Sequence, residues 1–408
     1  MSLDMRKFLG DLSWSAFGGM GAAGILFLVN LLGGRWLGPE EYGKFQIVVS
    51  VAQILMIPML FGFNTASARY IAEANISEKF VLRNTAFISV SILTLVFFLL
   101  FFLLSRIFFA GSETAFLSIL FAVTLTFFFL ARSFLQGFDR MKFISIADLS
   151  YAFLILVLFC VFFRVFFRGS GFEYMALSFL IGYIFFCGMA FLSLRVSRER
   201  AILSAKTFFI LFRYGFLATL GSVAGVFLGS VDKLLLNYYF DTKIVGVYAV
   251  YILISVTIFS QLTGFLSMHF FQQFRRFGTN ELFLKSFLRC AVFLLFVFLS
   301  SLPLASFLLL LFGKGYPFQF SSVVLSSLSA GIAVSYQIQM WFLNAEGIRG
   351  VKATVLGVFL CGILNLALNL LLIPLYSMTG ALLSLLLSGI VLHFYFSRTI
   401  RFLFSYED

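Results

Sequence analysis

Residues 37–45 have the sequence LGPEEYGKF, and residues 240–248 have the sequence FDTKIVGVY. The two stretches align without gaps, with Gly43 opposite Gly246 and Phe45 opposite Tyr248, so 203 residues separate the copies in a chain of 408. A second match follows the same order, because FLQG at 134–137 and FLNA at 342–345 are each followed by two basic residues. The chain is therefore predicted to consist of two related halves, residues 1–200 and 201–408.

The composition of both halves is that of a membrane protein. Hydrophobic residues make up 62% of the chain and charged residues 11%, and the mean hydropathy is +1.06. A soluble domain is roughly 45–50% apolar and about 25% charged, and one of this length could not bury so much apolar surface. The four cysteines lie in apolar runs without a CxxC pair, and no histidine has metal-ligand spacing, so we expect neither a metal nor a bound cofactor.

Apolar runs of about 20 residues, the length that crosses a bilayer, recur along the whole chain. Backbone groups inside the bilayer must be hydrogen-bonded within the protein, which an α-helix achieves segment by segment. We therefore predict an all-α integral membrane protein of about twelve transmembrane helices, in two six-helix bundles. The predicted spans are residues 12–32, 44–64, 85–109, 115–135, 144–167, 174–194, 208–238, 244–271, 286–312, 319–343, 352–375 and 379–397.

The basic residues predict the orientation of these spans. If the N-terminus is cytoplasmic, most of the 29 Lys and Arg residues fall in cytoplasmic segments, which is the usual bias of membrane proteins. Both termini are then cytoplasmic, since the number of spans is even. The formal net charge of +12 is explained by this bias, so we expect no nucleic-acid partner. The outer segments hold Arg35, Lys44, Arg106, Arg164, Arg168, Lys243 and Lys314, and Lys233 lies within a span.

Several stretches, in this order, resemble one known family. They are GRWLGPEEYG at 34–43, Phe61-Gly62, RYIAE at 69–73, Asp232-Lys233, residues 365–374 and Gly380-Ala381. Together they resemble the Wzx-type polysaccharide (O-antigen or exopolysaccharide) flippases, which belong to the multidrug/oligosaccharidyl-lipid/polysaccharide (MOP) exporter superfamily. Each motif is similar to a family pattern of packing and turn residues more than to a chemical signature.

The resemblance implies a transporter, not an enzyme. It implies a V-shaped pair of six-helix bundles in the inner (plasma) membrane, which work by alternating access. The cargo implied is an isoprenoid-diphosphate-linked oligosaccharide, moved from the cytoplasmic to the outer leaflet. Enzymes that make or use such a glycan, a polysaccharide polymerase or glycosyltransferases, are then the expected partners.

A charge inside a span is costly, at ~3 kcal/mol on insertion scales, so each one suggests a functional hypothesis. Asp232 and Lys233 lie near the predicted outer end of the seventh span. Lys233 could bind the diphosphate or a sugar, with Asp232 as its counter-charge or as a proton or cation site. Alternatively, both side chains could extend to the outer headgroups and fix helix packing.

The first half offers two further charged candidates within spans. Arg132 lies near the inner end of the fourth span, where its guanidinium could bind phosphate through two parallel hydrogen bonds; the alternative is an anchor at the inner leaflet. Asp148 lies one turn into the fifth span. It could take up and release an ion during transport, or pair with Arg140 or Lys142 at the membrane surface.

Four other residues complete the predicted substrate site. Arg69 lies at the inner mouth, where a cytoplasmic diphosphate would first arrive, and Arg35 lies at the outer rim beside Glu40 and Glu41, with which it could instead pair. Asn365 and Asn369 are four residues apart and share a helix face. Hydrogen bonding between helices is the alternative role for both asparagines.

Other functions of the same fold remain open. A lipid-linked peptidoglycan-precursor flippase is one, although the first three spans lack basic residues in their middle. A drug or cation antiporter is another, although only Asp148 and Asp232 could supply carboxylates to its cavity. A polysaccharide polymerase or a glycosyltransferase is a further alternative, and the short outer loops and the lack of a DxD or HExxH motif count against it. Export could be coupled to the membrane potential, a proton or sodium.

Overall fold

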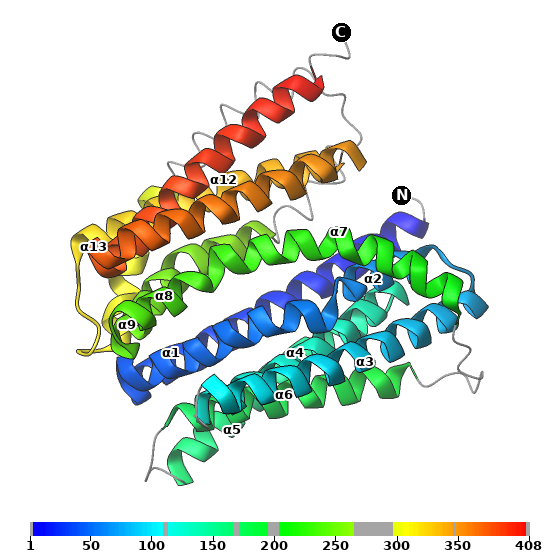
Figure 1. The fold of residues 1–408 in the computed structure, drawn as a ribbon, viewed down its shortest axis with the longest axis horizontal. Coiled ribbons are helices and arrows are strands. Elements are labelled where there is room, and N and C mark those ends of the chain that lie inside the picture. Colours follow the sequence, from blue (N-terminus) through cyan, green and yellow to red (C-terminus); the bar gives the residue numbers. More distant parts are fainter. Residues whose placement is uncertain are drawn as a thin grey trace. The chain divides into compact units, whose positions relative to one another are not determined.

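The computed structural model describes residues 3–108, 113–165, 171–194, 204–264, 297–345 and 348–404. The regular structure in these ranges is helical throughout (Figure 1), which confirms the predicted all-α class. The first seven helices are α1 (Leu3–Leu60), α2 (Phe63–Glu73), α3 (Ile76–Phe108), α4 (Glu113–Gly137), α5 (Met141–Val165), α6 (Phe172–Ser193) and α7 (Ala205–Gly229). They are followed by α8 (Val231–Tyr239), α9 (Thr242–Ile252), the π-helical turn η1 (Leu253–Thr257), α12 (Phe320–Ala345) and α13 (Ile348–Phe404).

Nine helices in the described ranges are long and apolar enough to cross a membrane. Two of them, Phe17–Leu60 and Arg349–Phe402, have 44 and 54 residues, about twice the length that one crossing needs. Each has one non-helical residue inside it: Gly38 (φ 77°, ψ 171°) in α1 and Ser377 (φ 52°, ψ −132°) in α13. Both residues fall in predicted connections between spans, so each long helix supplies two crossings. With the shorter apolar helix Val297–Phe312, the structure agrees with about twelve spans. The cytoplasmic location of both termini stays a prediction.

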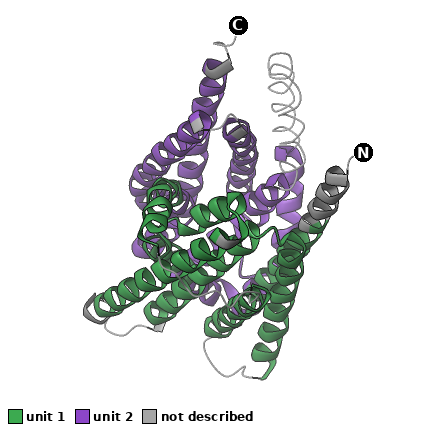
Figure 2. Ribbon diagram, turned by 90° about the vertical axis from the view of Figure 1, so that its right-hand side faces the viewer, with its two compact units in different colours: residues 1–33, 48–222 green, residues 34–47, 223–408 purple. Residues whose placement is uncertain are grey.

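The chain forms two compact units, which Figure 2 shows in two colours. Unit 1 comprises residues 1–33 and 48–222, and unit 2 comprises residues 34–47 and 223–408. The turn of α1 around Gly38 thus belongs to unit 2, whereas the flanking parts of the same helix belong to unit 1. The division into six-helix bundles at residues 1–200 and 201–408 stays a prediction.

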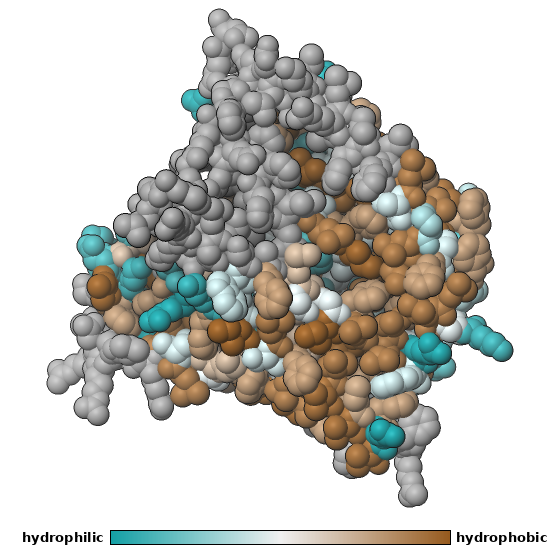
Figure 3. Space-filling model, turned by 180° about the vertical axis from the view of Figure 1, so that it is seen from behind, coloured by the Kyte–Doolittle hydropathy of each residue, from teal (hydrophilic) through white to brown (hydrophobic). Residues whose placement is uncertain are grey.

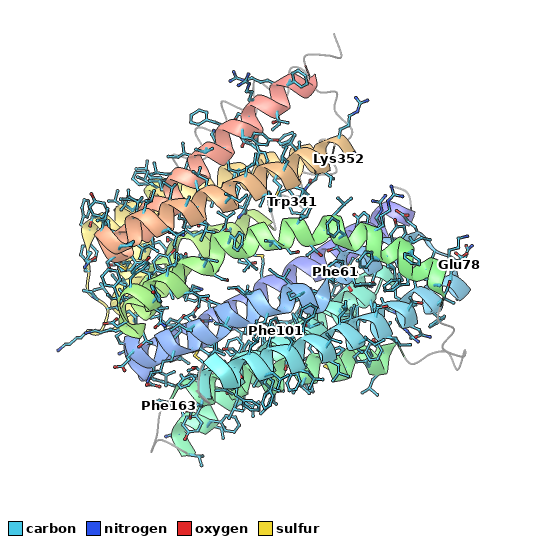
Figure 4. All side chains as sticks on the ribbon, viewed as in Figure 1. Phe61, Glu78, Phe101, Phe163, Trp341 and Lys352 are labelled. Atoms are coloured by element: carbon cyan, nitrogen blue, oxygen red, sulfur yellow. The ribbon has the colours of Figure 1, made fainter. Side chains whose placement is uncertain are left out.

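Helix α4 is central to unit 1, where it packs against α2, α3, α5 and α6. Its buried side chains Phe121 and Phe128 join a cluster of aromatic rings with Tyr151 of α5 and Phe186 of α6. At the end of α1 the backbone turns through Phe61 and Gly62, both with positive φ, before α2 begins. Phe61, which is labelled in Figure 4, lies at this turn. Its ring stacks on that of Phe212 of α7, with ring centroids 5.0 Å apart.

Unit 2 is built mainly on the packing of α12 against α13. One buried cluster contains Leu343 of α12 together with Cys361, Leu392 and Phe396 of α13. Helix α8 packs against α13 and α9, and η1 packs against α12. These contacts fix the short helices α8 and α9, which carry the charged and polar residues described below.

The outer face of the helices is apolar. On α3, Leu95, Leu99 and Leu103 are four residues apart and are 59%, 50% and 60% exposed. Figure 3 shows apolar side chains over much of the visible surface. Polar groups are costly in hydrocarbon, so such a surface suits contact with lipid tails. The chain is a multi-pass membrane protein.

Candidate functional site

Asp232 and Lys233 begin helix α8, directly after a break in the backbone. Helix α7 ends at Gly229, and Ser230 has non-helical angles (φ −132°, ψ −31°), so the predicted seventh span consists of two helices. The side chain of Asp232 is buried, and its Oδ1 accepts a hydrogen bond of 2.8 Å from the backbone N–H of Lys233. A carboxylate in the first turn of a helix is also favoured by the helix dipole.

The two adjacent charges have different neutral partners. Oδ2 of Asp232 accepts a hydrogen bond from the hydroxyl of Tyr248, a fully buried residue of α9. Nζ of Lys233 donates to Oε1 of Gln46, in the second part of α1, over 3.2 Å. Gln46 is also hydrogen-bonded to Tyr42. Within the described ranges no carboxylate lies in ion-pair distance of Nζ of Lys233, and this side chain is partly exposed.

The two copies of the sequence repeat meet beside this charged pair. A Cβ atom on Gly43 would lie 1.8 Å from the carbonyl oxygen of Thr242, and one on Gly246 would lie 1.9 Å from the carbonyl oxygen of Pro39. The same Cβ positions would be 3.0 Å and 3.1 Å from the backbone nitrogen of the other glycine. The aligned glycines thus form a reciprocal contact of backbone against backbone, which only glycine at both positions permits. We call this contact the repeat junction.

Unit 1 contains a second charged pair, Arg132 of α4 and Asp148 of α5. The guanidinium Nη1 and Nη2 atoms of Arg132 donate to Oδ1 and Oδ2 of Asp148, each over 2.8 Å. The carboxylate side chain is 4% exposed and the arginine side chain 33%. The predicted partners of Asp148, Arg140 and Lys142, are therefore wrong: the helix hairpin brings Arg132 across from Asp148, and a guanidinium matches both carboxylate oxygens.

Arg69 and Arg35 lie apart from both pairs. Arg69 lies on α2, 3.4 Å from Glu73 and over the ring of Tyr214 at 5.1 Å. A hydrogen bond to Tyr214 is the main cause that raises the pKa of Arg69 above its ordinary value, so its guanidinium stays charged. The alternative pairing of Arg35 with Glu40 or Glu41 is wrong, because Nη1 of Arg35 donates to the carbonyl of Leu311.

Glu40 and Glu41 have a different basic partner. Both pair with Lys44, one turn further along α1, at 3.9 Å and 2.6 Å. Lys44 lies on the same helix face as the two glutamates, whereas Arg35 precedes the break at Gly38.

Asn365 and Asn369 are buried in α13. Nδ2 of Asn365 donates to Oγ of Ser388, and Nδ2 of Asn369 donates to Oδ1 of Asn365, over 3.1 Å and 2.9 Å. Ser388 follows the break at Ser377, so this network joins the two parts of the helix. The arrangement favours the alternative of helix packing, and the predicted binding role stays a prediction.

Sequence reasoning did not find Gln46 and Tyr248 as partners of the charged pair. The sequence could have indicated a role for Tyr248, because the repeat aligns this tyrosine with Phe45 of the first copy. A buried phenol requires a hydrogen-bond partner. Gln46 follows Phe45 directly but has no distinguishing pattern. Within the described ranges, no group of three or more His, Cys, Asp or Glu side chains could hold a metal ion.

The fold is that of the MOP-superfamily transporters. The chain is similar to an inward-facing multidrug resistance MATE family transporter of that superfamily (16% identity, TM-score 0.63, covering 93% of this chain and 95% of the other). It is also similar to the lipid II flippase MurJ in an inward closed conformation (13% identity, TM-score 0.64, covering 95% of this chain and 87% of the other). A third similar structure is a MOP transporter from Pyrococcus furiosus whose binding pocket has reversed polarity (16% identity, TM-score 0.52, covering 96% of this chain and 95% of the other).

The family itself is identified from the sequence. Residues 8–271 match the profile of the polysaccharide biosynthesis protein family. No curated protein matches the chain significantly. Because the match covers more than half of the chain, the protein belongs to the polysaccharide biosynthesis protein family, which confirms the resemblance found in its motifs.

Proposed function

We propose that this protein is a flippase that moves an isoprenoid-diphosphate-linked oligosaccharide from the cytoplasmic to the outer leaflet of the inner membrane by alternating access. The observation that carries the proposal, beyond the family, is Lys233. Its ammonium group lies within a membrane span, is partly exposed, and is hydrogen-bonded to an amide oxygen instead of a carboxylate. Asp232 acts on this ammonium through space, but within the described ranges no carboxylate is hydrogen-bonded to it, so an anionic diphosphate can take the place of the amide.

The energetic argument follows from the cost of a charge in the membrane. A lysine costs about 2.5–3.5 kcal/mol at the centre of a span on insertion scales and less near its ends, so Lys233, near the predicted outer end, bears part of this cost. A carboxylate partner would reduce this cost but would also compete with an anionic ligand. Asp232, the adjacent carboxylate, is bound by Tyr248 and the backbone. This leaves the Lys233 ammonium to Gln46, which a stronger acceptor can replace.

Export of cationic drugs is a weaker candidate. A site for such cargo needs accessible carboxylates, and the two that lie in spans are engaged: Asp148 by Arg132, and Asp232 by Tyr248. A lipid-linked peptidoglycan precursor is a closer alternative, because it carries the same diphosphate group, and lipid II is the cargo named for the similar flippase MurJ. The two glycan alternatives therefore differ in the sugar and not in the chemistry at Lys233.

The energy source follows from the charge of the cargo. An inside-negative potential contributes about 2.3 kcal/mol per elementary charge per 100 mV, which favours outward passage of a diphosphate whose charge is not fully compensated. We propose that the potential assists export. A proton or sodium ion returning through Asp232 is the further proposal, since Asp148 is paired with Arg132, and an enzyme that polymerises the exported glycan is the expected partner.

The test is flipping by the purified protein in proteoliposomes. A lipid-linked oligosaccharide, lipid II and a cationic dye are offered separately, and glycan arriving on the far leaflet is detected with a membrane-impermeant lectin or label. We expect transport of the lipid-linked oligosaccharide, faster with a favourable clamped potential, and none of the dye. Transport of the dye alone would contradict the proposal, and transport of lipid II alone would assign the peptidoglycan branch. Equal rates with and without the potential would exclude its role.

A further inference from the structure

The repeat junction positions the groups that bind both charges of the site. Gln46 follows Gly43 by three residues, one helical turn, and its amide reaches Nζ of Lys233. Tyr248 follows Gly246 by two residues, and its hydroxyl reaches Asp232. The second copy of the repeat thus supplies one neutral partner of the charged pair, and the residue directly after the first copy supplies the other.

The segment 34–47 makes polar contacts with the rest of unit 2, among them three hydrogen bonds. Besides the bond from Lys233 to Gln46, the hydroxyl of Tyr316 donates to the carbonyl of Gly34, and Arg35 donates to the carbonyl of Leu311. Of these three contacts, the bond of Lys233 is the one made by a charge inside a span. It is therefore the contact that an anionic ligand inside the membrane can exchange.

We propose that Gln46 is a positioning residue that holds the Lys233 ammonium until the diphosphate of the cargo takes its place, and that this exchange loosens the repeat junction. The identity of the anion rests on the proposed function. The present bond is 3.2 Å long and has an ionised donor but a neutral acceptor, whereas in a bond to a diphosphate both groups are ionised, so the attraction between opposite charges favours the exchange. Binding of cargo is thereby coupled to movement of the segment around Gly43.

Two substitutions of Gln46 distinguish a role in positioning the Lys233 ammonium from a role in packing alone. In Gln46→Glu, a carboxylate would pair permanently with Lys233, so an isoprenyl diphosphate should bind about tenfold more weakly. In Gln46→Leu, the ammonium loses its acceptor, so the junction should be loosened before any ligand is added. A residue that only packs would give the same result in both variants.

Opening of the repeat junction is measured as the rate at which a maleimide labels a cysteine introduced at a buried position. Val245 precedes Gly246 and is fully buried, so Val245→Cys in a background without native cysteines reports on the junction. Ala330→Cys is the control, because Ala330 is equally buried in a different cluster with Phe259, Val297 and Val334. The probe is farnesyl diphosphate, farnesol is its uncharged control, and binding is measured separately by isothermal titration calorimetry.

We expect farnesyl diphosphate, but not farnesol, to raise the maleimide labelling rate of Val245→Cys about tenfold, because it replaces one hydrogen bond to a charged group. Ala330→Cys should not respond, and Gln46→Leu should label rapidly without the probe. Binding without faster labelling, or unchanged affinity in Gln46→Glu, would overturn the inference while the proposed function stands. No binding of farnesyl diphosphate to the wild-type protein would instead contradict the diphosphate chemistry of the proposed function.

Discussion

Each unit contains a buried aspartate that is hydrogen-bonded to a residue 16 positions away on the neighbouring helix, but the two partners differ in charge. In unit 1, Asp148 meets Arg132 across a helix hairpin, and in unit 2, Asp232 meets Tyr248 across another; both pairs are 16 residues apart. The carboxylate of unit 1 is neutralised by two hydrogen bonds from a guanidinium, whereas the carboxylate of unit 2 has a phenol. The nearest cation in unit 2, Lys233, has a separate neutral partner.

The difference indicates which site can receive a charged cargo. In the bidentate pair of unit 1 each charge is bound by the opposite charge through two hydrogen bonds, and a ligand would have to compete with that partner. Asp232 and Lys233 attract each other through space but are hydrogen-bonded to neutral groups, which an ionic ligand can replace. We therefore propose that the pair in unit 1 stabilises the structure and that the pair in unit 2 takes part in transport.

The largest effect is expected where the ion pair of unit 1 is broken. Arg132→Met would leave a carboxylate that is 4% exposed without its partner, and we expect a loss of about 3 kcal/mol in stability. Asp148→Leu should cost less, because the arginine side chain is 33% exposed and its head can move. Thermal unfolding of the protein in nanodiscs measures both. The double variant should regain most of the stability, and failure to do so would contradict a structural pair.

The repeat junction of unit 2 should be the next most sensitive point. Gly246→Ala places a Cβ atom where the carbonyl of Pro39 lies, and overpacking of this kind costs about 2 kcal/mol. Gly24→Ala is the matched control, because a Cβ atom there meets no other atom within 4 Å. The melting temperature of Gly246→Ala should fall, while that of the control should stay or rise. Equal melting temperatures would show that the reciprocal glycine contact does not stabilise the protein.

The pair of unit 2 can also be weakened without changing its charges. Tyr248→Phe gives the second repeat the residue of the first and removes one hydrogen bond to Asp232, which should cost about 1.5 kcal/mol. Tyr238→Phe on α8 is the control, since that side chain is 79% exposed. Chemical denaturation in detergent distinguishes the two variants. If both lose the same stability, the phenol is not the partner that holds Asp232.

The smallest effect is expected for the asparagines of α13, which lie in unit 2 but away from the pair. Asn365→Ala removes one hydrogen bond to Ser388 and one from Asn369, at a cost of about 1 kcal/mol. Flipping per folded molecule should equal that of the wild type. Full stability with loss of flipping would restore the predicted binding role and extend the transport site beyond α8.

Hydrophobicity and turn residues are sufficient to predict most of the fold. The spans and the turn at Gly38 follow from apolar length and from the turn residues between the apolar runs. The break at Ser230 and the π-helical turn Leu253–Thr257 lie inside predicted spans, where an apolar sequence shows no local signal. Tertiary packing determines such irregularities, and local composition does not show it.

The sequence predicts which charged residues belong to the candidate site, but not which residues they contact. Charges within spans can be recognised because they are costly, so Lys233, Asp232, Arg132 and Asp148 all stood out. Their partners depend on which helix faces meet. Arg132 and Asp148 lie at similar distances from the turn between α4 and α5, and this spacing could have predicted their pairing. Gln46 is 187 residues from Lys233, and no local pattern joins them.

The assignment of transport to Lys233 is tested most directly by flipping rates measured per folded molecule. Lys233→Met is compared in proteoliposomes with the Arg132→Met/Asp148→Leu double variant, and with Lys314→Met as a control at an exposed lysine of unit 2. We predict that Lys233→Met flips the lipid-linked oligosaccharide at least about tenfold more slowly than the wild type, as expected for loss of a hydrogen bond to a charged group, and that the other two variants flip normally. Normal flipping by Lys233→Met, with loss of flipping in the folded double variant, would contradict the assignment and move the transport site to unit 1.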